Sequence, residues 1–192
     1  MEEVYGDRLI AALRAKYDEK MAEKEPVGGE IVIGNSKILL KRETLFGGKC
    51  SMMLPDIMKD MAYRDRMEIY PKQSPPVVKT DGDATITFSS ISMTEAGRTE
   101  SAYQLLMRMR KDMKKVRKQN VFYETGEETA GGLAVAWMDH KGFCLDGALY
   151  SMVFLFRMRE EYTLGDFHCS FSQYDMWKPV IKKLLTTIQV DE

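Results

Sequence analysis

The stretch from Asn120 to Phe171 decides the fold of this chain. It holds four largely apolar segments, NVFYETGEE (120–128), GLAVAWMDH (132–140), GALYSMVFLFRM (147–158) and EYTLGDFHCSF (161–171). Turn-forming glycines lie between them, at Gly131-Gly132 and Asp146-Gly147. Because short connections join antiparallel neighbours, the stretch predicts four consecutive strands of an antiparallel sheet.

Further strand signals precede this stretch. Apolar and polar residues alternate over 30–33, 37–46 and 49–54, which are the expected strands, with turns at Gly34-Asn35 and Gly47-Gly48. Pro55 is expected to end the third strand. A half-buried strand is expected over 84–92, where Ile86 and Phe88 alternate with hydroxyl side chains. The residues in between suggest a short connector with helical character (56–62), an extended piece (66–70) and a loop (73–83).

Three segments show helical periodicity. Residues 2–25 carry a narrow apolar stripe, which could pack on the rest of the chain or pair with a second copy. Residues 95–119, with Thr94 as the expected N-cap, carry a wider stripe of Ala102, Leu105, Leu106, Met109, Met113 and Val116. Residues 176–189 form the last helix, which should begin near Asp175 because Pro179 is tolerated only in a first turn.

This order of elements predicts an α+β fold, with a central antiparallel sheet and helices on both of its faces. We expect a single α+β domain over 27–192, preceded by an N-terminal helical extension over 1–26. Core positions are expected for Trp177 and for the aromatic residues of the last two strands. Trp137 and Tyr123 could belong either to the core or to an open groove. The fifteen methionines are either core filler or an adaptable binding surface.

Four phrases of the sequence resemble a known family: MMLP (52–55), ATITFSSIS (84–92), GDFHCSF (165–171) and WKPVIKKLLTTI (177–188). Together they resemble the PsbP-like superfamily, over roughly residues 30–190. That superfamily includes PsbP itself, the Ran-binding import factor Mog and bacterial DcrB-like proteins, among them the Eag chaperones. The resemblance implies an α/β/α sandwich and a binding or assembly role. It transfers no site residue, because its members bind different partners.

Composition excludes several classes of protein. The chain has 192 residues, of which 44% are apolar, and its 28 basic and 29 acidic side chains give a net charge of -1. This composition lacks the signature of disorder. No apolar run is long enough to span a membrane, and the N-terminal MEEVYGDR lacks the features of a secretory signal. We therefore expect a cytoplasmic protein with no overall attraction to nucleic acid or membrane.

The candidate chemical groups form no recognisable catalytic or metal motif. The spacings of Cys50, Cys144 and Cys169 match no zinc pattern. His140, Cys144, His168 and Cys169 are the candidate metal ligands, but the adjacent His168 and Cys169 point to opposite faces of a strand. A nucleophilic pair, Cys144 with His168 or Cys169 with His140, requires that the fold bring the partners together. The sequence therefore predicts no catalytic, cofactor or metal site, and an enzyme with an unrecognised site is the alternative.

The clearest charge feature is the second half of the 95–119 helix. Only Asp112 opposes its basic residues, which include Arg108, Arg110, Lys111, Lys114, Lys115 and Lys118. This surface fits an acidic protein partner, nucleic acid or an anionic surface, and it could also be an ordinary solvated helix face. Nucleic acid is disfavoured because no aromatic residue is interleaved to stack bases.

The sequence thus predicts a non-catalytic, cytoplasmic protein-binding module such as an adaptor, assembly factor or chaperone. Its partner would be a protein, with residues 108–118 as the binding surface. A homodimer is expected through residues 2–25 or through an exposed sheet edge.

Overall fold

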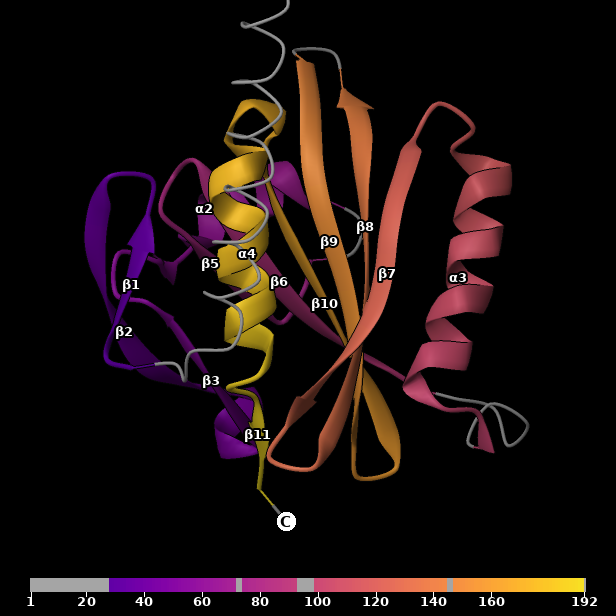
Figure 1. The fold of residues 1–192 in the computed structure, drawn as a ribbon, viewed down its shortest axis with the longest axis horizontal. Helices are drawn as coiled ribbons and strands as arrows, with labels where there is room; N and C mark the ends of the chain where they lie inside the picture. Colours follow the sequence, from indigo (N-terminus) through magenta and orange to yellow (C-terminus); the bar gives the residue numbers. More distant parts are fainter. Residues whose placement is uncertain (1–27, 72–73, 93–98, 145–146, 192) are drawn as a thin grey trace, which may run out of the picture.

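The computed structural model describes residues 28–71, 74–92, 99–144 and 147–191. Two antiparallel sheets are present in this part of the chain, of four and seven strands (Figure 1). The first has the order β1-β2-β3-β11, with bounds Glu30–Ile33, Ser36–Leu45, Cys50–Pro55 and Gln189–Val190. The second has the order β4-β5-β6-β10-β9-β8-β7, with bounds Lys59–Asp60, Val77–Thr80, Ala84–Ile91, Glu161–Ser170, Gly147–Met158, Leu133–Cys144 and Val121–Ala130.

Three α-helices accompany the sheets: α2 (Tyr63–Ile69), α3 (Ala102–Val116) and α4 (Tyr174–Leu185). Two short 3-10 helices, η1 (Phe46–Gly48) and η3 (Phe171–Gln173), lie at the ends of strands. The helix expected over 2–25, and with it the extension over 1–26, lies outside the described residues.

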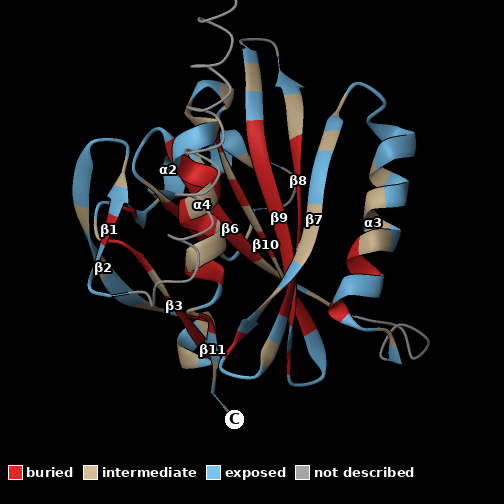
Figure 2. Ribbon diagram, viewed as in Figure 1, coloured by how far each residue is buried: buried red, intermediate tan, exposed pale blue. Residues whose placement is uncertain are grey.

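The expected meander of four strands is confirmed as β7, β8, β9 and β10, each antiparallel to the next. Both glycines of the β7–β8 turn have positive φ, as a tight hairpin requires. β8 alternates between two environments, with Val135 and Trp137 in one hydrophobic cluster and Ala136 and Met138 in another. Both faces of the central strands are therefore buried (Figure 2).

The two faces are covered by different layers. α3 packs against β8 and β9 on one face. On the other face the core includes Trp177, Ile181 and Leu184 of α4 together with Leu45 and Met52 of the smaller sheet. The prediction of helices on both faces is confirmed, but the first strands do not join the central sheet. They form the four-stranded sheet, which shares one layer with α4, because their apolar faces are buried in the same core as α4.

Four local expectations between residues 56 and 92 are wrong. The connector over 56–62 is not helical and contains the short strand β4, because Lys59 and Asp60 pair with β5. The expected extended piece over 66–70 is part of helix α2, which is too short to show a periodic stripe. Residues 77–80, within the expected loop, form strand β5. Pro75 and Pro76 do not prevent its pairing with β6, because they lie before the first paired residue, Val77. The hydroxyl face of β6 is buried as well, at Thr85 and Thr87, because this strand lies inside the seven-stranded sheet.

The expected boundaries of the second long helix are also corrected. α3 begins at Ala102, and Ser101 rather than Thr94 caps it, in a capping box with Gln104. Val116, the last residue of the expected stripe, is 82% exposed, because it lies at the end of the helix beyond the apolar part of the sheet. The last helix begins at Tyr174, close to the predicted Asp175, and Trp177 is buried as expected. Two expectations for this helix are wrong: Pro179 lies in its second turn rather than its first, and the helix ends at Leu185 because residues 189–190 pair with β3 as β11.

One buried ion pair ties α4 to the seven-stranded sheet. Lys178 Nζ lies 3.0 Å from Asp139 Oδ2 and 3.1 Å from Glu124 Oε2. The other oxygen of Asp139 accepts a hydrogen bond from the backbone N–H of Glu124, and Tyr150 donates its hydroxyl to Oδ2. Burial alone would lower the pKa of Lys178, but the two carboxylates raise it. The lysine is therefore held as a cation inside the core.

We expect Gly165→Ala to lower the free energy of unfolding by about 2 kcal/mol, because there is no space for a methyl group. A Cβ at Gly165 would lie 1.9 Å from the ring of Phe154, which is itself fully buried. Gly29→Ala is the matched control, since nothing lies within 4 Å of its Cβ position. Urea unfolding of both variants measures the difference, and equal midpoints would contradict the packing seen here.

Candidate functional site

Helix α3 covers only half of its sheet face. Its first turns bury Ala102, Leu105 and Leu106 against the apolar residues Ala136, Met138, Val153, Leu155 and Tyr162. Farther along α3, Met109 and Met113 are only partly buried. The sheet beneath this second half of the helix is thus left partly open.

The open part of the sheet face is polar. The register places Phe122, His140, Ser151, His168 and Thr85 side by side on five neighbouring strands. Directly opposed residues on antiparallel strands have side chains on the same face. Both histidines of the chain therefore face α3, a juxtaposition that the sequence spacing did not predict.

A groove with a volume of about 670 Å³ lies between α3 and this row. Met109 and Met113 of α3 line one wall, and Ile69 and Tyr70 from the end of α2 line another. The turn after α3 contributes Arg117, Gln119 and Asn120, and the strands contribute His140, Gly142, Cys144, Leu149, Ser151, Val153, Leu164, Asp166 and His168. The volume is in the range of small-molecule sites, which is about 300–1,000 Å³.

His140 is the most buried ionisable group of the groove. It is 4% exposed, and its ring stacks on Phe122 with 5.1 Å between centroids. Burial lowers the pKa of His140, and the nearby Arg117 cation lowers it further, against the opposing effect of Asp166 and Asp139. The imidazole is therefore held neutral, with one nitrogen as a donor and the other as an acceptor.

Ser151, Asp166 and His168 form a second polar group in the groove. Ser151 Oγ donates to Asp166 Oδ1 at 2.5 Å, and His168 Nδ1 lies 3.8 Å from Asp166 Oδ2. In a serine hydrolase the histidine lies between the serine and the acid. Here the acid lies between the other two, so the serine is hydrogen-bonded to a carboxylate and not to a histidine. The arrangement holds Asp166 in place and differs from that of a serine hydrolase.

Three polar atoms in the groove walls are buried without a hydrogen-bond partner among the described residues. They are Tyr70 OH, Asn120 Nδ2 and His140 Nδ1. An unpaired buried polar atom costs about 1–3 kcal/mol. Such atoms are uncommon in folded proteins, and several in one groove mark it as the strongest candidate for a ligand site.

The candidate metal ligands and nucleophiles are only partly brought together. His140, Cys144 and His168 line the groove, but Cys169 lies in the core on the opposite face, as expected for neighbours in a strand. The strand expected over 132–140 continues to Cys144, so His140 and Cys144 both lie on β8. Cys144 donates its thiol to the carbonyl of Gly147 at 3.2 Å. Within the described ranges, no group of three His, Cys, Asp or Glu residues could hold a metal ion.

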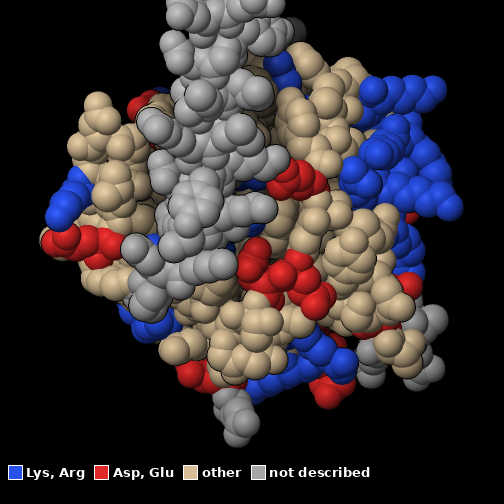
Figure 3. Space-filling model, viewed as in Figure 1, with Lys and Arg blue, Asp and Glu red and all other residues tan. Residues whose placement is uncertain are grey.

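The predicted basic surface lies on the second half of α3 and the turn after it (Figure 3). Arg108 pairs with Glu100 at 3.0 Å, and Lys115 pairs with Asp112 at 2.9 Å. Two more cations lie over the ring of Phe122, Arg110 at 5.6 Å and Lys114 at 5.5 Å from its centroid. Lys111 and Lys118 are exposed, and neither pairs with a carboxylate in the part of the chain that is described.

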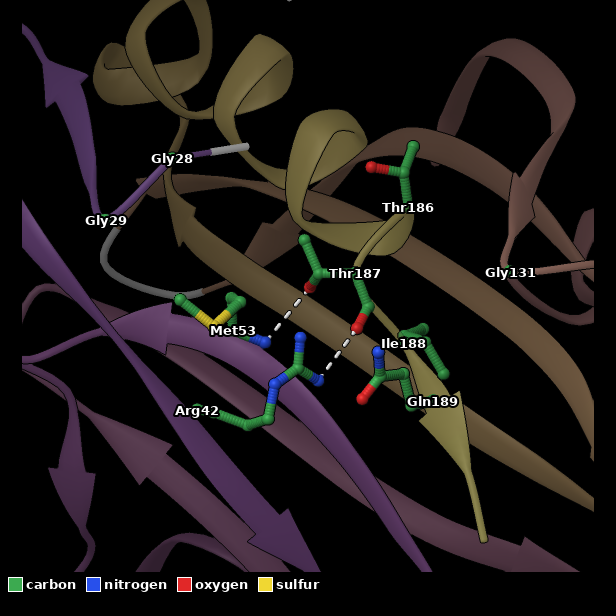
Figure 4. Close-up of a pocket in the computed structure, with 9 residues that line it drawn as sticks. All are labelled: Gly28, Gly29, Arg42, Met53, Gly131, Thr186, Thr187, Ile188 and Gln189. Carbon is green, nitrogen blue, oxygen red and sulfur yellow. Dashed lines mark hydrogen bonds between the residues drawn. The ribbon is translucent and has the colours of Figure 1, made fainter. Parts of the chain in front are cut away.

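A second hollow, of about 590 Å³, lies between the smaller sheet and the end of α4 (Figure 4). Arg42 lines this hollow, and its guanidinium donates to Ser51 Oγ at 3.1 Å and to the carbonyl of Thr187 at 3.2 Å. Thr187 Oγ1 accepts from the backbone N–H of Met53 at 3.0 Å. These polar groups satisfy one another and join β2 and β3 to the chain after α4, so we assign this hollow a structural role.

The aromatic residues divide between core and surface. Phe154, Phe156, Tyr162, Phe167 and Trp137 are buried, as the core prediction requires. Phe171 is only half-buried and stacks on Tyr174 at the start of α4. Tyr123, at 40% exposed, lies on the surface. No helix of the described chain has the length and apolar character needed to cross a membrane.

Comparison with known proteins identifies the fold. No protein-family profile matches the chain. No curated protein matches it in sequence. The structure is similar to that of the cyanobacterial PsbP of Synechocystis sp. PCC 6803, with a TM-score of 0.58 and 12% identity, covering 88% of this chain and 99% of that one.

Two further solved structures are similar. The Saccharomyces cerevisiae Ran-binding protein Mog1p has a TM-score of 0.53 and 10% identity, covering 80% of this chain and 96% of that one. A protein of Bacteroides thetaiotaomicron has a TM-score of 0.53 and 9% identity, covering 79% of this chain and 48% of that one. The resemblance to the PsbP-like superfamily is thus confirmed for the fold.

We expect the protein to become less stable as the pH falls below neutrality. The pKa of His140 is lowered from its ordinary value of about 6.5, so the unfolded chain binds a proton at a higher pH than the folded protein. The free energy of unfolding therefore falls as the pH drops through about 6.5 toward the folded pKa. His140→Gln should flatten this decline, measured by urea unfolding from about pH 7.5 to about pH 5.

His168→Gln is the control for this prediction, because His168 lies in the same row but is more exposed. If both substitutions flatten the decline equally, or if neither does, the assignment of the effect to burial of His140 is wrong.

We expect one of the three cysteines to react quickly with a thiol reagent such as DTNB in the native protein, and all three in denaturant. Burial raises the pKa of Cys50 to about 11 and that of Cys169 to about 12, so neither forms the reactive thiolate. Cys144 is exposed. Cys144→Ser should remove the fast reaction, and a fast reaction that persists in that variant would show that a core cysteine is accessible.

Proposed function

We propose that the protein is a non-catalytic binding protein that holds an acidic segment of a protein partner against the basic half of α3. The observation that carries this proposal is the charge of residues 108–118. This exposed segment at the end of α3 contains seven basic side chains and one acidic side chain. Lys111 and Lys118 have no ion pair among the described residues, so they can neutralise a partner's carboxylates without breaking existing pairs.

A binding role is favoured over catalysis by the arrangement of the reactive groups. Asp166 separates Ser151 from His168, and the thiol of Cys144 donates to a carbonyl of its own hairpin. Ser151 is hydrogen-bonded to a carboxylate and not to a histidine, so the groove lacks the serine–histidine pair of a serine hydrolase.

A protein partner is favoured over nucleic acid for two reasons. Phe122, the aromatic residue within the basic surface, is already stacked on His140 and covered by Arg110 and Lys114. It therefore offers no platform for stacking bases. The neighbouring edge strand β7 carries glutamates, which would repel a phosphate backbone. A protein of the same fold, Mog1p, is described as Ran-binding, which is compatible with a protein-binding role for this fold.

Three further expectations belong to this proposal. A cytoplasmic location and a homodimer remain predictions, as does the division into an extension over 1–26 and a domain over 27–192. The exposed edge of β7 is a poor homodimer contact, because a two-fold pairing of this edge would bring Glu124, Glu127 and Glu128 of both copies close together.

The proposal predicts that a charge-reversed variant, Lys111→Glu with Lys118→Glu, loses a specific protein partner. Tagged wild-type and variant proteins would be used to capture partners from nuclease-treated lysate of the native host. A partner that binds wild type stoichiometrically should fall by about tenfold or more with the variant, and its binding should weaken as salt is raised.

Lys37→Glu with Lys49→Glu is the matched control, because Lys37 on β2 and Lys49 in the turn before β3 are both exposed and the change in net charge is the same. Lys37 differs from the target lysines in lying 3.9 Å from a carboxylate, that of Glu30. The control should keep the partner. Capture that is equal for all three proteins would contradict the basic surface. Capture of nucleic acid alone, before nuclease treatment, would favour the nucleic-acid alternative.

A further inference from the structure

We infer that the groove beneath α3 is a binding site for a small organic carboxylate with an apolar body. This site shares Arg117 with the proposed protein-binding surface but otherwise differs from it, because it is built from the inner wall of α3 and the sheet rather than from the exposed lysines. Three features carry the inference: buried polar nitrogens without a hydrogen-bond partner, a cation without an ion pair, and an apolar wall leading away from them.

These groups lie at the end of the groove where the turn after α3 approaches β8. Arg117 is near enough to His140 for its charge to lower the pKa of that residue. The backbone N–H of Asn120 donates to the carbonyl of Arg117 at 3.0 Å, which folds the turn back on itself. The amide of Asn120 lies 3.9 Å from the Cβ position of Gly142, two residues beyond His140 on the same face of β8.

These groups lack partners within the described chain. His140 Nδ1 and Asn120 Nδ2 are buried and unpaired, and Arg117 makes no ion pair in the described ranges. His140 is more than nine-tenths buried and belongs to the groove wall. A carboxylate accepts hydrogen bonds at both of its oxygens and pairs with a guanidinium in a forked geometry. It therefore supplies what this end of the groove lacks, after small side-chain rotations that turn the unpaired atoms toward it.

The rest of the groove defines the body of the ligand. Met109 and Met113 line the helix side, and Val153 and Leu164 line the sheet side. Asp166 lies on β10, and its carboxylate reaches toward β9, where Ser151 donates to Oδ1 at 2.5 Å. Its charge disfavours a second carboxylate on the β9 side of His140, so the acid group of the ligand is placed on the β7 side, beside Asn120 and Arg117. Thioether side chains adapt to apolar groups of different shapes, which favours an alkyl or acyl body.

Calorimetric titration of the full-length protein with octanoate, octan-1-ol and octylamine tests the inference. Octanoate should bind saturably, at least about tenfold more tightly than octan-1-ol, and octylamine should be weaker than both. Arg117→Gln and Asn120→Ala should each weaken octanoate by about tenfold and leave octan-1-ol unchanged. Equal binding of the three probes, or octanoate binding that neither substitution changes, would overturn the inference.

Two controls are needed. The first distinguishes binding in the groove from binding to the exposed lysines, and the second distinguishes a free organic acid from the C-terminal carboxylate of a peptide. Lys111→Glu with Lys118→Glu should leave octanoate binding unchanged, so that the failure of the protein-binding surface and the failure of this groove can be told apart. A tripeptide, acetyl-Ala-Leu-Leu, would be compared with its C-terminal amide. Binding of the free acid alone shows that a polypeptide chain end can supply the carboxylate, whereas binding of octanoate but not of the peptide assigns the site to a free acid. Absence of binding by every carboxylate probe would exclude the site.

Discussion

The structure depends on the burial of both faces of the central strands. β8, β9 and β10 alternate between two hydrophobic clusters, so neither face can be left in water. The chain meets this requirement with two different layers, α3 on one side and α4 with the four-stranded sheet on the other. The remaining elements are placed by this constraint. β11 after α4 returns to pair with β3 and so ties the C-terminal segment to the smaller sheet.

The two faces differ in how completely they are covered. On the α4 side, even the charged groups are paired, with Lys178 held between Asp139 and Glu124. Breaking such a pair by removing one partner costs about 3–5 kcal/mol. On the α3 side, a helix of 15 residues covers the apolar half of the sheet and projects beyond it. The uncovered half carries the polar row with His140, Ser151 and His168. The groove is a direct result of this mismatch between the helix and the sheet beneath it.

Because α3 extends beyond the apolar half of the sheet, the helix carries two different surfaces. The outer side of α3 presents lysines to solvent, and its inner side presents methionines to the groove. Phe122 lies between them, with cations above its ring and His140 against it. A partner on the outer surface and a carboxylate in the groove would thus be separated by one stacked pair of rings. This proximity offers a physical route by which occupancy of one surface could affect the other.

The sequence by itself determined the meander, the last helix and the α+β class. Alternation with period two and glycine turns are local signals, and the structure follows them, whereas Pro179 lies inside α4 rather than in its first turn. The basic half of α3 was equally visible, because a run of charges needs no tertiary contact to be recognised. Short elements were missed at α2 and β5, since seven or four residues carry too little periodicity to compete with neighbouring prolines. Only the tertiary structure decided that His140 and His168 share a row and that Cys169 lies in the core. It also decided that Arg117 and Asn120 line the same groove as the two histidines. Strand register sets these neighbours, and register depends on how whole strands bury their faces rather than on spacing along the chain.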